Sequence, residues 1–295
     1  MALDTGDAVS SVLGSWGVRR GAELVRRFDH GVGGTSLIDI DGSRRVLKVW
    51  TLTSDEDEAL LDDALKLAEI MRCRGVAVPA LIERGSSAGY GYLVYEFLDG
   101  EWSAELGPDA VADMMSVIDA TRDAAPAPND GWVAELETML DQGDASFDIA
   151  PDALAASAVA EAVLAEARRR LAACDTAGLR TSDIVHGDFA PENLLIHDGN
   201  VVGVVDWERA RVGDSGLDLV GAIFDVEIAK KAHARLRQEL WCMARERMPT
   251  DALAAYVGLY AVRYLSWSVG TDMEEQVLAL AQLTLRQSDV TAPSP

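Results

Sequence analysis

One segment of the chain combines residue types that can do chemistry. "IVHGDFAPENLLIHDGNVVGVVDWE", residues 184–208, sets Asp188, Asn193 and Asp206 beside two apolar runs. The turn sequence "HDGN" predicts a β-hairpin of these runs, which brings Asn193 and Asp206 together at one end. Carboxylate and amide oxygens suit Mg²⁺, which shares its coordination with phosphates and water, and Asp188 is left to accept a proton from a hydroxyl. The segment predicts a centre for phosphoryl transfer.

The other residues with metal-binding side chains do not form a recognisable site. His186 has no neighbouring His or Cys to complete a zinc site, so we expect it to brace its loop. Cys73, Cys174 and Cys242 are odd in number, far apart and without metal-like spacing, so we expect reduced thiols.

A Gly-rich stretch near the N-terminus is a candidate phosphate cradle. In "HGVGGTS", residues 30–36, glycines allow backbone N–H groups to approach an anion, and a hydroxyl could add to them. The alternative is an ordinary hairpin turn. The candidate ligands are Gly31, Gly33, Gly34, Thr35 and Ser36.

Lys48 is the candidate cation for the phosphates. It lies in "RVLKVW", one strand after the Gly-rich turn and before an acid-rich helix, an arrangement in which a lysine grips nucleotide phosphates and a carboxylate orients it. Glu58, Asp62 and Asp63 are all possible partners. A solvated edge lysine is the alternative reading.

The predicted elements divide the chain into two lobes. Residues 22–50 read as an antiparallel meander, residues 54–75 as a helix capped by Ser54 and ended by Gly75, and two further strands follow. We therefore expect an α+β fold with a small antiparallel-sheet N-lobe with one main helix, residues 1–98, and a larger, mostly helical C-lobe, residues 99–295. The C-lobe helices or helix pairs are expected at 108–123, 130–142, 151–174, 216–247 and 250–286.

Composition narrows the possible partners. The formal net charge of −23 argues against binding nucleic acid or an anionic membrane. No apolar run reaches the length of a membrane span, and the N-terminus lacks the features of a signal peptide, so we expect a cytoplasmic protein. The acidic excess would attract a cationic small molecule, although solubility alone also explains it. Aromatic residues that could pack against such a cation are Trp132, Tyr256, Tyr260, Tyr264 and Trp267.

Two motifs together resemble a known family. "HGDFAPENLLI" followed by "VVDWERARVGDSGLDL" is similar to the aminoglycoside phosphotransferase and choline-kinase-like family of small-molecule kinases, and Asp214 and Asp218 match its pattern after the metal ligand. The resemblance implies a bilobal protein-kinase-like fold. His-Gly-Asp in place of His-Arg-Asp, Trp207 in place of Phe and the lack of an Ala-Pro-Glu segment argue against a protein substrate.

The resemblance also implies site roles. Asp188 matches the catalytic base, Asn193 and Asp206 match the Mg²⁺ ligands, and Lys48 matches the phosphate-gripping lysine. ATP is the expected phosphoryl donor, and GTP is not excluded. The hinge that meets the purine matches the segment "YEFL", with Glu96, Phe97 and Leu98 as its binding residues.

The acceptor is less defined than the donor. A cationic antibiotic, of the aminoglycoside type or a basic cyclic peptide such as viomycin or capreomycin, is the leading expectation, with resistance by O-phosphorylation as its consequence. Macrolides, choline and homoserine are alternatives, as is a catalytically silent scaffold that binds nucleotide. The sequence does not indicate the oligomeric state.

Overall fold

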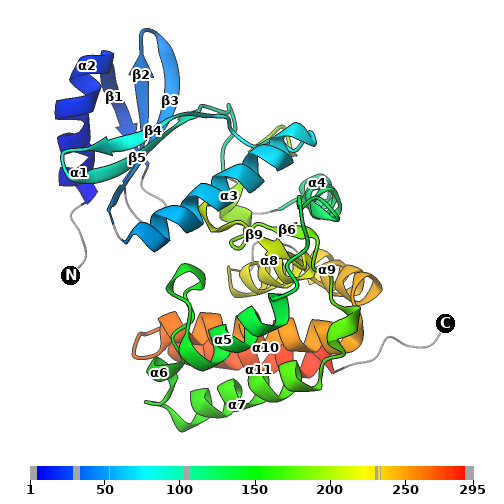
Figure 1. Cartoon of the computed structure of the whole chain (residues 1–295). Helices are drawn as coiled ribbons and strands as arrows, with labels where there is room; N and C mark the ends of the chain where they lie inside the picture. Colours follow the sequence, from blue (N-terminus) through cyan, green and yellow to red (C-terminus); the bar gives the residue numbers. More distant parts are fainter. Residues whose placement is uncertain are drawn as a thin grey trace.

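The computed structural model describes residues 5–28, 34–52, 54–102, 106–229, 232 and 234–289, and it has a sheet-bearing part and a helical part (Figure 1). The sheet is antiparallel, with the strand order β1-β2-β3-β5-β4. Together the two parts form the α+β architecture that was predicted. The strands are β1 (Ala22–Arg27), β2 (Thr35–Ile40), β3 (Ser43–Thr51), β4 (Leu81–Ser87) and β5 (Tyr90–Glu96).

One face of this sheet is covered by an N-terminal helical segment that the sequence analysis did not predict. It consists of α1 (Thr5–Val12), a π-helical turn (Leu13–Gly17) and α2 (Val18–Arg20). Val12 and Trp16 are buried in one cluster with Ile38 and Leu47 of the sheet. Because side chains alternate along a strand, this contact determines which residues of β2 and β3 face α1 and which face the opposite way.

Helix α3 (Asp55–Cys73) begins and ends as predicted. The Ser54 side chain accepts a hydrogen bond from the Asp57 N–H, and the Asp57 carboxylate accepts one from the Ser54 N–H, which forms a capping box. Ala64, Leu67 and Met71 are buried on one side of the helix, but they belong to the large cluster of the helical part rather than to the sheet's cluster. Helix α3 thus lies between the two parts (Figure 1).

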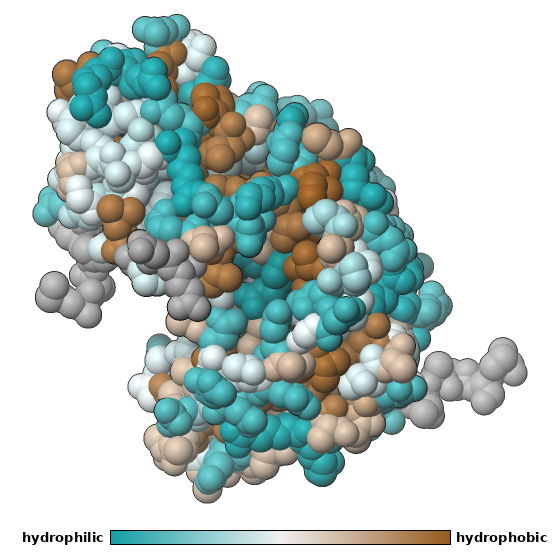
Figure 2. All heavy atoms as spheres, viewed as in Figure 1, coloured by the Kyte–Doolittle hydropathy of each residue, from teal (hydrophilic) through white to brown (hydrophobic). Residues whose placement is uncertain are grey.

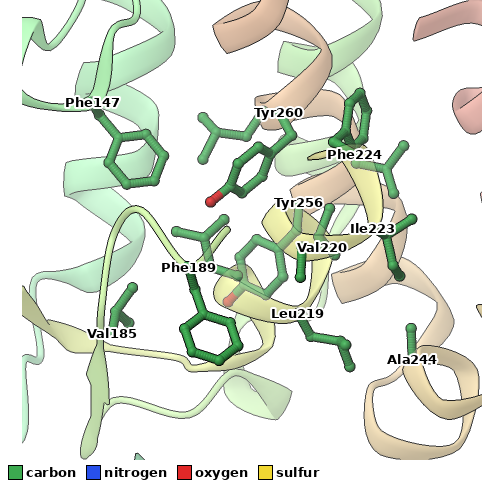
Figure 3. Close-up of a cluster of buried hydrophobic side chains, with 14 of the residues drawn as sticks. Phe147, Val185, Phe189, Leu219, Val220, Ile223, Phe224, Ala244, Tyr256 and Tyr260 are labelled. Carbon is green, nitrogen blue, oxygen red and sulfur yellow. The ribbon is translucent and has the colours of Figure 1, made fainter. Parts of the chain in front are cut away.

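The helical part is organised around α10 (Thr250–Ser268), which packs against helices on several sides. Nearly every residue of α10 between Ala252 and Leu265 is buried, and Figure 3 shows Tyr256 and Tyr260 in this core. Among the described residues, no helix has both the length and the apolar character needed to cross a membrane. The other helices are α4 (Pro108–Thr121), α5 (Trp132–Gln142), α6 (Pro151–Leu154), α7 (Ala158–Ala173), α8 (Gly216–Ala229), α9 (Ala234–Arg247) and α11 (Glu274–Ser288).

Two small two-stranded sheets carry the motif segment. The predicted hairpin is confirmed: β7 (Leu194–His197) pairs with β8 (Asn200–Val204) through a turn at Asp198 and Gly199. Before and after it, β6 (Asp183–Val185) pairs with β9 (Arg211–Gly213), a strand that was not predicted. The short helices η4 (Pro191–Asn193) and η5 (Trp207–Arg209) flank the hairpin.

Candidate active site

Asp188, Asn193 and Asp206 meet at one end of the β7–β8 hairpin. Leu194 pairs with Val204 at the last rung, and the Val205 N–H donates to the Asn193 carbonyl at 2.9 Å, so Asn193 and Asp206 leave the hairpin side by side. The Asn193 Nδ2 donates to the Asp188 carbonyl at 2.7 Å. The structure therefore brings together the three residues that the sequence placed at the reaction centre.

His186 makes the bracing contacts that were expected of it. Its Nε2 lies 2.9 Å from the Val205 carbonyl, and its Nδ1 accepts a hydrogen bond from the Asp188 N–H at 3.2 Å. Nδ1 as acceptor and Nε2 as donor describe a neutral ring, in agreement with the lowered pKa of His186, for which burial is the main cause. Its ring packs against Trp207 with a centroid distance of 4.5 Å.

Gly187 explains why the motif reads His-Gly-Asp. Its φ is +81°, and a Cβ at this position would lie 2.6 Å from the Arg209 carbonyl oxygen. An arginine at this position would have a strained backbone conformation and a Cβ that clashes with the Arg209 carbonyl. The close approach of the loop to η5 therefore requires glycine.

Two buried carboxylates of the motif hold the surrounding backbone. Asp218 accepts hydrogen bonds from the N–H groups of His186 at 2.6 Å and Gly187 at 3.0 Å, and burial raises its pKa to about 7. Asp214 accepts from the N–H groups of Gly216 and Arg180. Asp218 thus anchors the Asp188 loop to α8, and Asp214 connects the start of α8 to the backbone at Arg180.

Lys48 reaches from the sheet to the motif segment. Its Nζ lies 2.5 Å from Asp206 Oδ1 and 2.9 Å from Glu208 Oε1, and the Tyr95 hydroxyl donates to the same Glu208 oxygen at 2.9 Å. Burial lowers the pKa of Lys48, but the carboxylates of Glu208 and Asp206 outweigh it, so the pKa is raised and Lys48 is a cation.

None of the three helix carboxylates considered as partners contacts Lys48. Glu58 and Asp62 both form ion pairs with Arg84, and Asp63 pairs with Lys66. The expectation of an α3 carboxylate was wrong, because Arg84 of β4 neutralises the acidic side of α3. The carboxylates that bind Lys48 follow the hairpin instead.

The structure separates the two hydroxyls of the predicted phosphate cradle. Thr35 pairs directly with Lys48 across β2 and β3, so both side chains lie on the same face of the sheet. Ser36 pairs with Leu47 and is fully buried on the face that α1 covers, so the prediction that it contacts phosphate was wrong. Alternation along the strand makes it impossible for both residues to face one ligand.

Gly34 is required by the fold itself. Its φ is +84°, and a Cβ would clash with the Val49 carbonyl oxygen, so the close approach of residue 34 to β3 requires glycine. Gly31 and Gly33 lie outside the described residues. The phosphate cradle therefore remains a prediction. Among the described residues, Gly34 and Thr35 are its remaining candidate ligands.

The predicted hinge begins with the last two residues of β5, Tyr95 and Glu96. The Glu96 N–H donates to the Ala80 carbonyl at 2.9 Å, so this group is already engaged, and Phe97 and Leu98 come next in the chain. Glu101 then exchanges two backbone hydrogen bonds with Ile196 of β7, at 3.0 and 2.8 Å. The linker is thus attached to the hairpin that carries Asn193.

A second cation contacts Asp188, and the sequence analysis did not anticipate it. Arg263 of α10 places Nη2 at 2.6 Å from Asp188 Oδ1 and 3.4 Å from Asp148 Oδ2. Asp148, in the loop after α5, also binds Arg209 of η5 at 2.5 Å. A lone arginine in the apolar stretch "AAYVGLYAVRYLSW" was the available signal.

The donor set suits a magnesium ion that shares its ligands with a phosphate. No three His, Cys, Asp or Glu side chains form a group that could hold a metal within the part of the chain that the structure describes. Asn193 and Asp206 instead supply an amide oxygen and a carboxylate, and Mg²⁺ usually takes one or two protein ligands with phosphate oxygens and water. The two residues therefore fit the ion that the resemblance implies.

The sequence matches the phosphotransferase enzyme family over residues 24–275. The chain belongs to this family. The resemblance seen in the two motifs is thereby confirmed, and family membership extends over both the sheet and most of the helical part.

Two relatives of this chain have names that describe the phosphorylation of an antibiotic. The aminoglycoside 3'-phosphotransferase of Streptomyces fradiae is 30% identical over 175 residues, which cover 54% of this chain and 62% of that protein. The viomycin phosphotransferase of Streptomyces vinaceus is 43% identical over 68 residues, which cover 21% of this chain and 24% of that protein. The matches thus span less than two thirds of either relative.

Solved structures confirm the predicted bilobal fold. The aminoglycoside phosphotransferase APH(4)-Ia, in a ternary complex with ADP and hygromycin B, superposes with a TM-score of 0.68 at 17% identity over 93% of this chain and 97% of that one. The choline kinase LicA from Streptococcus pneumoniae superposes with a TM-score of 0.61 at 15% identity over 90% and 94% of the two chains. At these identities the likeness concerns the fold alone.

Proposed function

We propose that this family member transfers the γ-phosphoryl group of ATP to a hydroxyl of a small cationic molecule, most specifically an antibiotic. The observation that carries the proposal is the convergence of four groups from two parts of the chain: Lys48 of the sheet, and Asp188, Asn193 and Asp206 of the motif segment. Phosphoryl transfer needs a cation for the phosphates, oxygen ligands for a metal and a carboxylate at the incoming hydroxyl.

In the proposed reaction, Asn193 and Asp206 are the residues that would hold Mg²⁺, and the ion would neutralise phosphate charge. Lys48 exchanges Asp206 for the phosphates while Glu208 keeps it oriented, and Phe97 and Leu98 offer backbone groups to the purine. Asp188 accepts a hydrogen bond from the acceptor hydroxyl and orients it for in-line attack. The new bond joins the acceptor oxygen to phosphorus, the bond to the ADP oxygen breaks, and Asp188 takes the proton.

The charge state of Asp188 supports this role. Burial raises its pKa, but the positive charges of Arg263 and Arg209 outweigh burial, so the pKa of Asp188 lies below its ordinary value. The carboxylate is therefore ionised at neutral pH and able to accept a hydrogen bond.

A hollow in the helical part supports a cationic acceptor. It measures about 530 Å³, and its lining includes Asp144, Asp148, Asp152 and Trp267. Asp148 is also a ligand of Arg263, which contacts Asp188, so two ion pairs connect the wall of the hollow to the proposed catalytic carboxylate. Carboxylates and an indole ring suit a polycationic ligand, and the formal net charge of −23 would attract one.

The preference for an antibiotic rests on the two named relatives, which act on aminoglycosides and viomycin according to their names. We place the phosphoryl transfer itself in the indentation between the sheet-bearing part and the helical part, where Figure 2 shows hydrophilic surface.

A substrate screen tests the proposal. We would measure Mg²⁺-dependent ADP release with aminoglycosides, viomycin and capreomycin, and in parallel with a macrolide, choline and homoserine. We expect an acceptor-dependent rate for a cationic antibiotic, loss of this rate in EDTA, and a product heavier by about 80 Da for one phosphoryl group. A rate only with choline, homoserine or the macrolide would replace the antibiotic by that acceptor, and nucleotide binding without transfer to any of them would favour a silent scaffold.

A further inference from the structure

The buried stretch of α10 from Ala252 to Leu265 contains a single charged side chain, Arg263. Arg263 is 8% exposed, between buried residues such as Val262 and Tyr264. Removing a charge from water is costly, and a buried ion pair is often no more stabilising than packed apolar residues of similar volume. Packing alone therefore does not explain an arginine at this position.

The contacts of Arg263 are concentrated on the Asp188 loop. Its Nη2 binds Asp188 Oδ1 at 2.6 Å, and its Nη1 donates to the Gly187 carbonyl at 3.2 Å. The planar guanidinium thus contacts both the side chain of Asp188 and the backbone just before it. Such a fork restrains the direction of a carboxylate, which a single-point contact does not.

Two aromatic rings restrain the guanidinium itself. Its central carbon lies 4.7 Å from the ring centroid of Phe147 and 5.4 Å from that of Tyr260. Both rings are at most 1% exposed, and Figure 3 shows them pointing toward one another from different elements. Contact with these packed rings leaves Arg263 little freedom to move.

Asp148 connects this arrangement to the hollow. Its carboxylate lies 3.4 Å from Arg263 Nη2 and 2.5 Å from Arg209 Nη1, and Asp148 also lines the hollow. Arg209 is three residues after Asp206, so one carboxylate joins the wall of the proposed acceptor site to both the Asp188 loop and the metal-binding turn.

We propose that Arg263 is a positioning residue for phosphoryl transfer: it holds Asp188 in the direction that the acceptor hydroxyl requires, with Asp148 as its anchor at the wall of the acceptor site. The inference rests on the proposed function. It assigns the arginine a part in turnover rather than in ATP binding, because its contacts are to the Asp188 loop and not to Lys48 or Asn193.

Kinetics of three variants test this role. Arg263→Met keeps a long side chain but removes the charge, and Arg263→Lys keeps the charge but loses the fork. We expect Arg263→Met to lower kcat by about 100-fold, the effect of a misplaced reacting group, with the KM for ATP within about twofold of wild type, and Arg263→Lys to recover part of the loss. Arg170→Met is the matched control, because the side chains of Arg170 and Arg263 are both 9% exposed and ion-paired, and Arg170 binds Glu166 and Asp289 away from the site.

A second measurement needs no acceptor. Hydrogen exchange of the amides at His186–Asp188 should be faster in Arg263→Met than in wild type and unchanged in Arg170→Met. Equal exchange in all three folded proteins, or equal loss of kcat in Arg170→Met and Arg263→Met, would overturn the proposal. If the wild type transfers phosphate to no acceptor, the proposed function fails, while the exchange experiment still reports whether Arg263 holds the loop.

Discussion

Two cations serve the candidate reaction centre, and they are held in different ways. The side chain of Lys48 is 20% exposed, and its Nζ contacts the carboxylates of Asp206 and Glu208. The side chain of Arg263 is 9% exposed and contacts the Asp188 carboxylate, a backbone carbonyl and two aromatic rings.

The difference indicates which cation exchanges its partners. Asp206 is a proposed metal ligand, so nucleotide and metal would compete for the groups that bind Lys48. The partners of Arg263 include the Gly187 backbone and packed rings, which a ligand would not displace. A lysine is a point charge on a flexible stem and an arginine is a rigid fork, so each residue type suits its place.

The largest expected effect is at Asp188, the carboxylate that Arg263 contacts and that we propose as the catalytic base. Asp188→Asn retains the shape of the side chain but removes the charge that accepts the hydroxyl proton. We expect kcat to fall by about 10²–10⁴-fold, with ATP affinity within about twofold of wild type by calorimetric titration. Turnover equal to wild type would remove Asp188 from the reaction.

Lys48→Met sharpens the contrast with Arg263→Met. Loss of a charge-assisted contact to the phosphates, worth about 1.5–3 kcal/mol, should raise the KM for ATP by about 10–100-fold. Arg263→Met should instead lower kcat at saturating ATP. If steady-state kinetics show the same parameter changing in both variants, the two cations do not have separate tasks.

Glu208→Gln tests which carboxylate orients Lys48. We expect a smaller increase in the KM for ATP, about fivefold, because Lys48 loses the carboxylate that orients it when Asp206 holds the metal, a hydrogen bond worth about 1 kcal/mol. Glu58→Gln is the control, because Glu58 binds Arg84 instead. A larger increase in KM for Glu58→Gln than for Glu208→Gln would indicate that Glu58 of α3, and not Glu208, orients Lys48.

A partly buried carboxylate with a raised pKa, Asp225, completes the comparison. Burial is the main cause that raises the pKa of Asp225 to about 7, and Tyr264 is its hydrogen-bond partner, whereas the pKa of Asp188 is lowered. A raised carboxyl pKa favours the folded state fully below the unfolded value near 3.8, and this contribution is lost as pH rises through about 7. Asp225→Asn should therefore be more stable than wild type at pH 8, on the order of 1 kcal/mol or about 2 °C in Tm, with the difference shrinking toward pH 4. Thermal unfolding at both pH values measures this, and a difference that is independent of pH would contradict it.

Local signals made the motif segment predictable. The turn between β7 and β8, the capping box of α3 and the spacing of Asp188, Asn193 and Asp206 all involve residues close together in the chain. The backbone preferences of these residues do not depend on distant contacts, so the turn and the helix cap can be predicted from the sequence.

Distant contacts were not predictable in the same way. Lys48 and Glu208 are 160 residues apart, and Asp188 and Arg263 are 75 apart. No periodic pattern links such positions. The face of Ser36 depends on α1, which was itself not predicted, so the error in the cradle followed from the missing helix.

The burial of α3 has a consequence for how the chain unfolds. Its apolar side belongs to the cluster of the helical part, although it follows the sheet strands in sequence. We retain residues 1–98 as the proposed nucleotide-binding lobe. Because α3 is buried against the helical part, we expect that residue 98 does not separate two cooperative folding units. A fragment of residues 1–98 would expose Leu67 and Met71 to water, and we expect it to associate or unfold rather than behave as an autonomous domain.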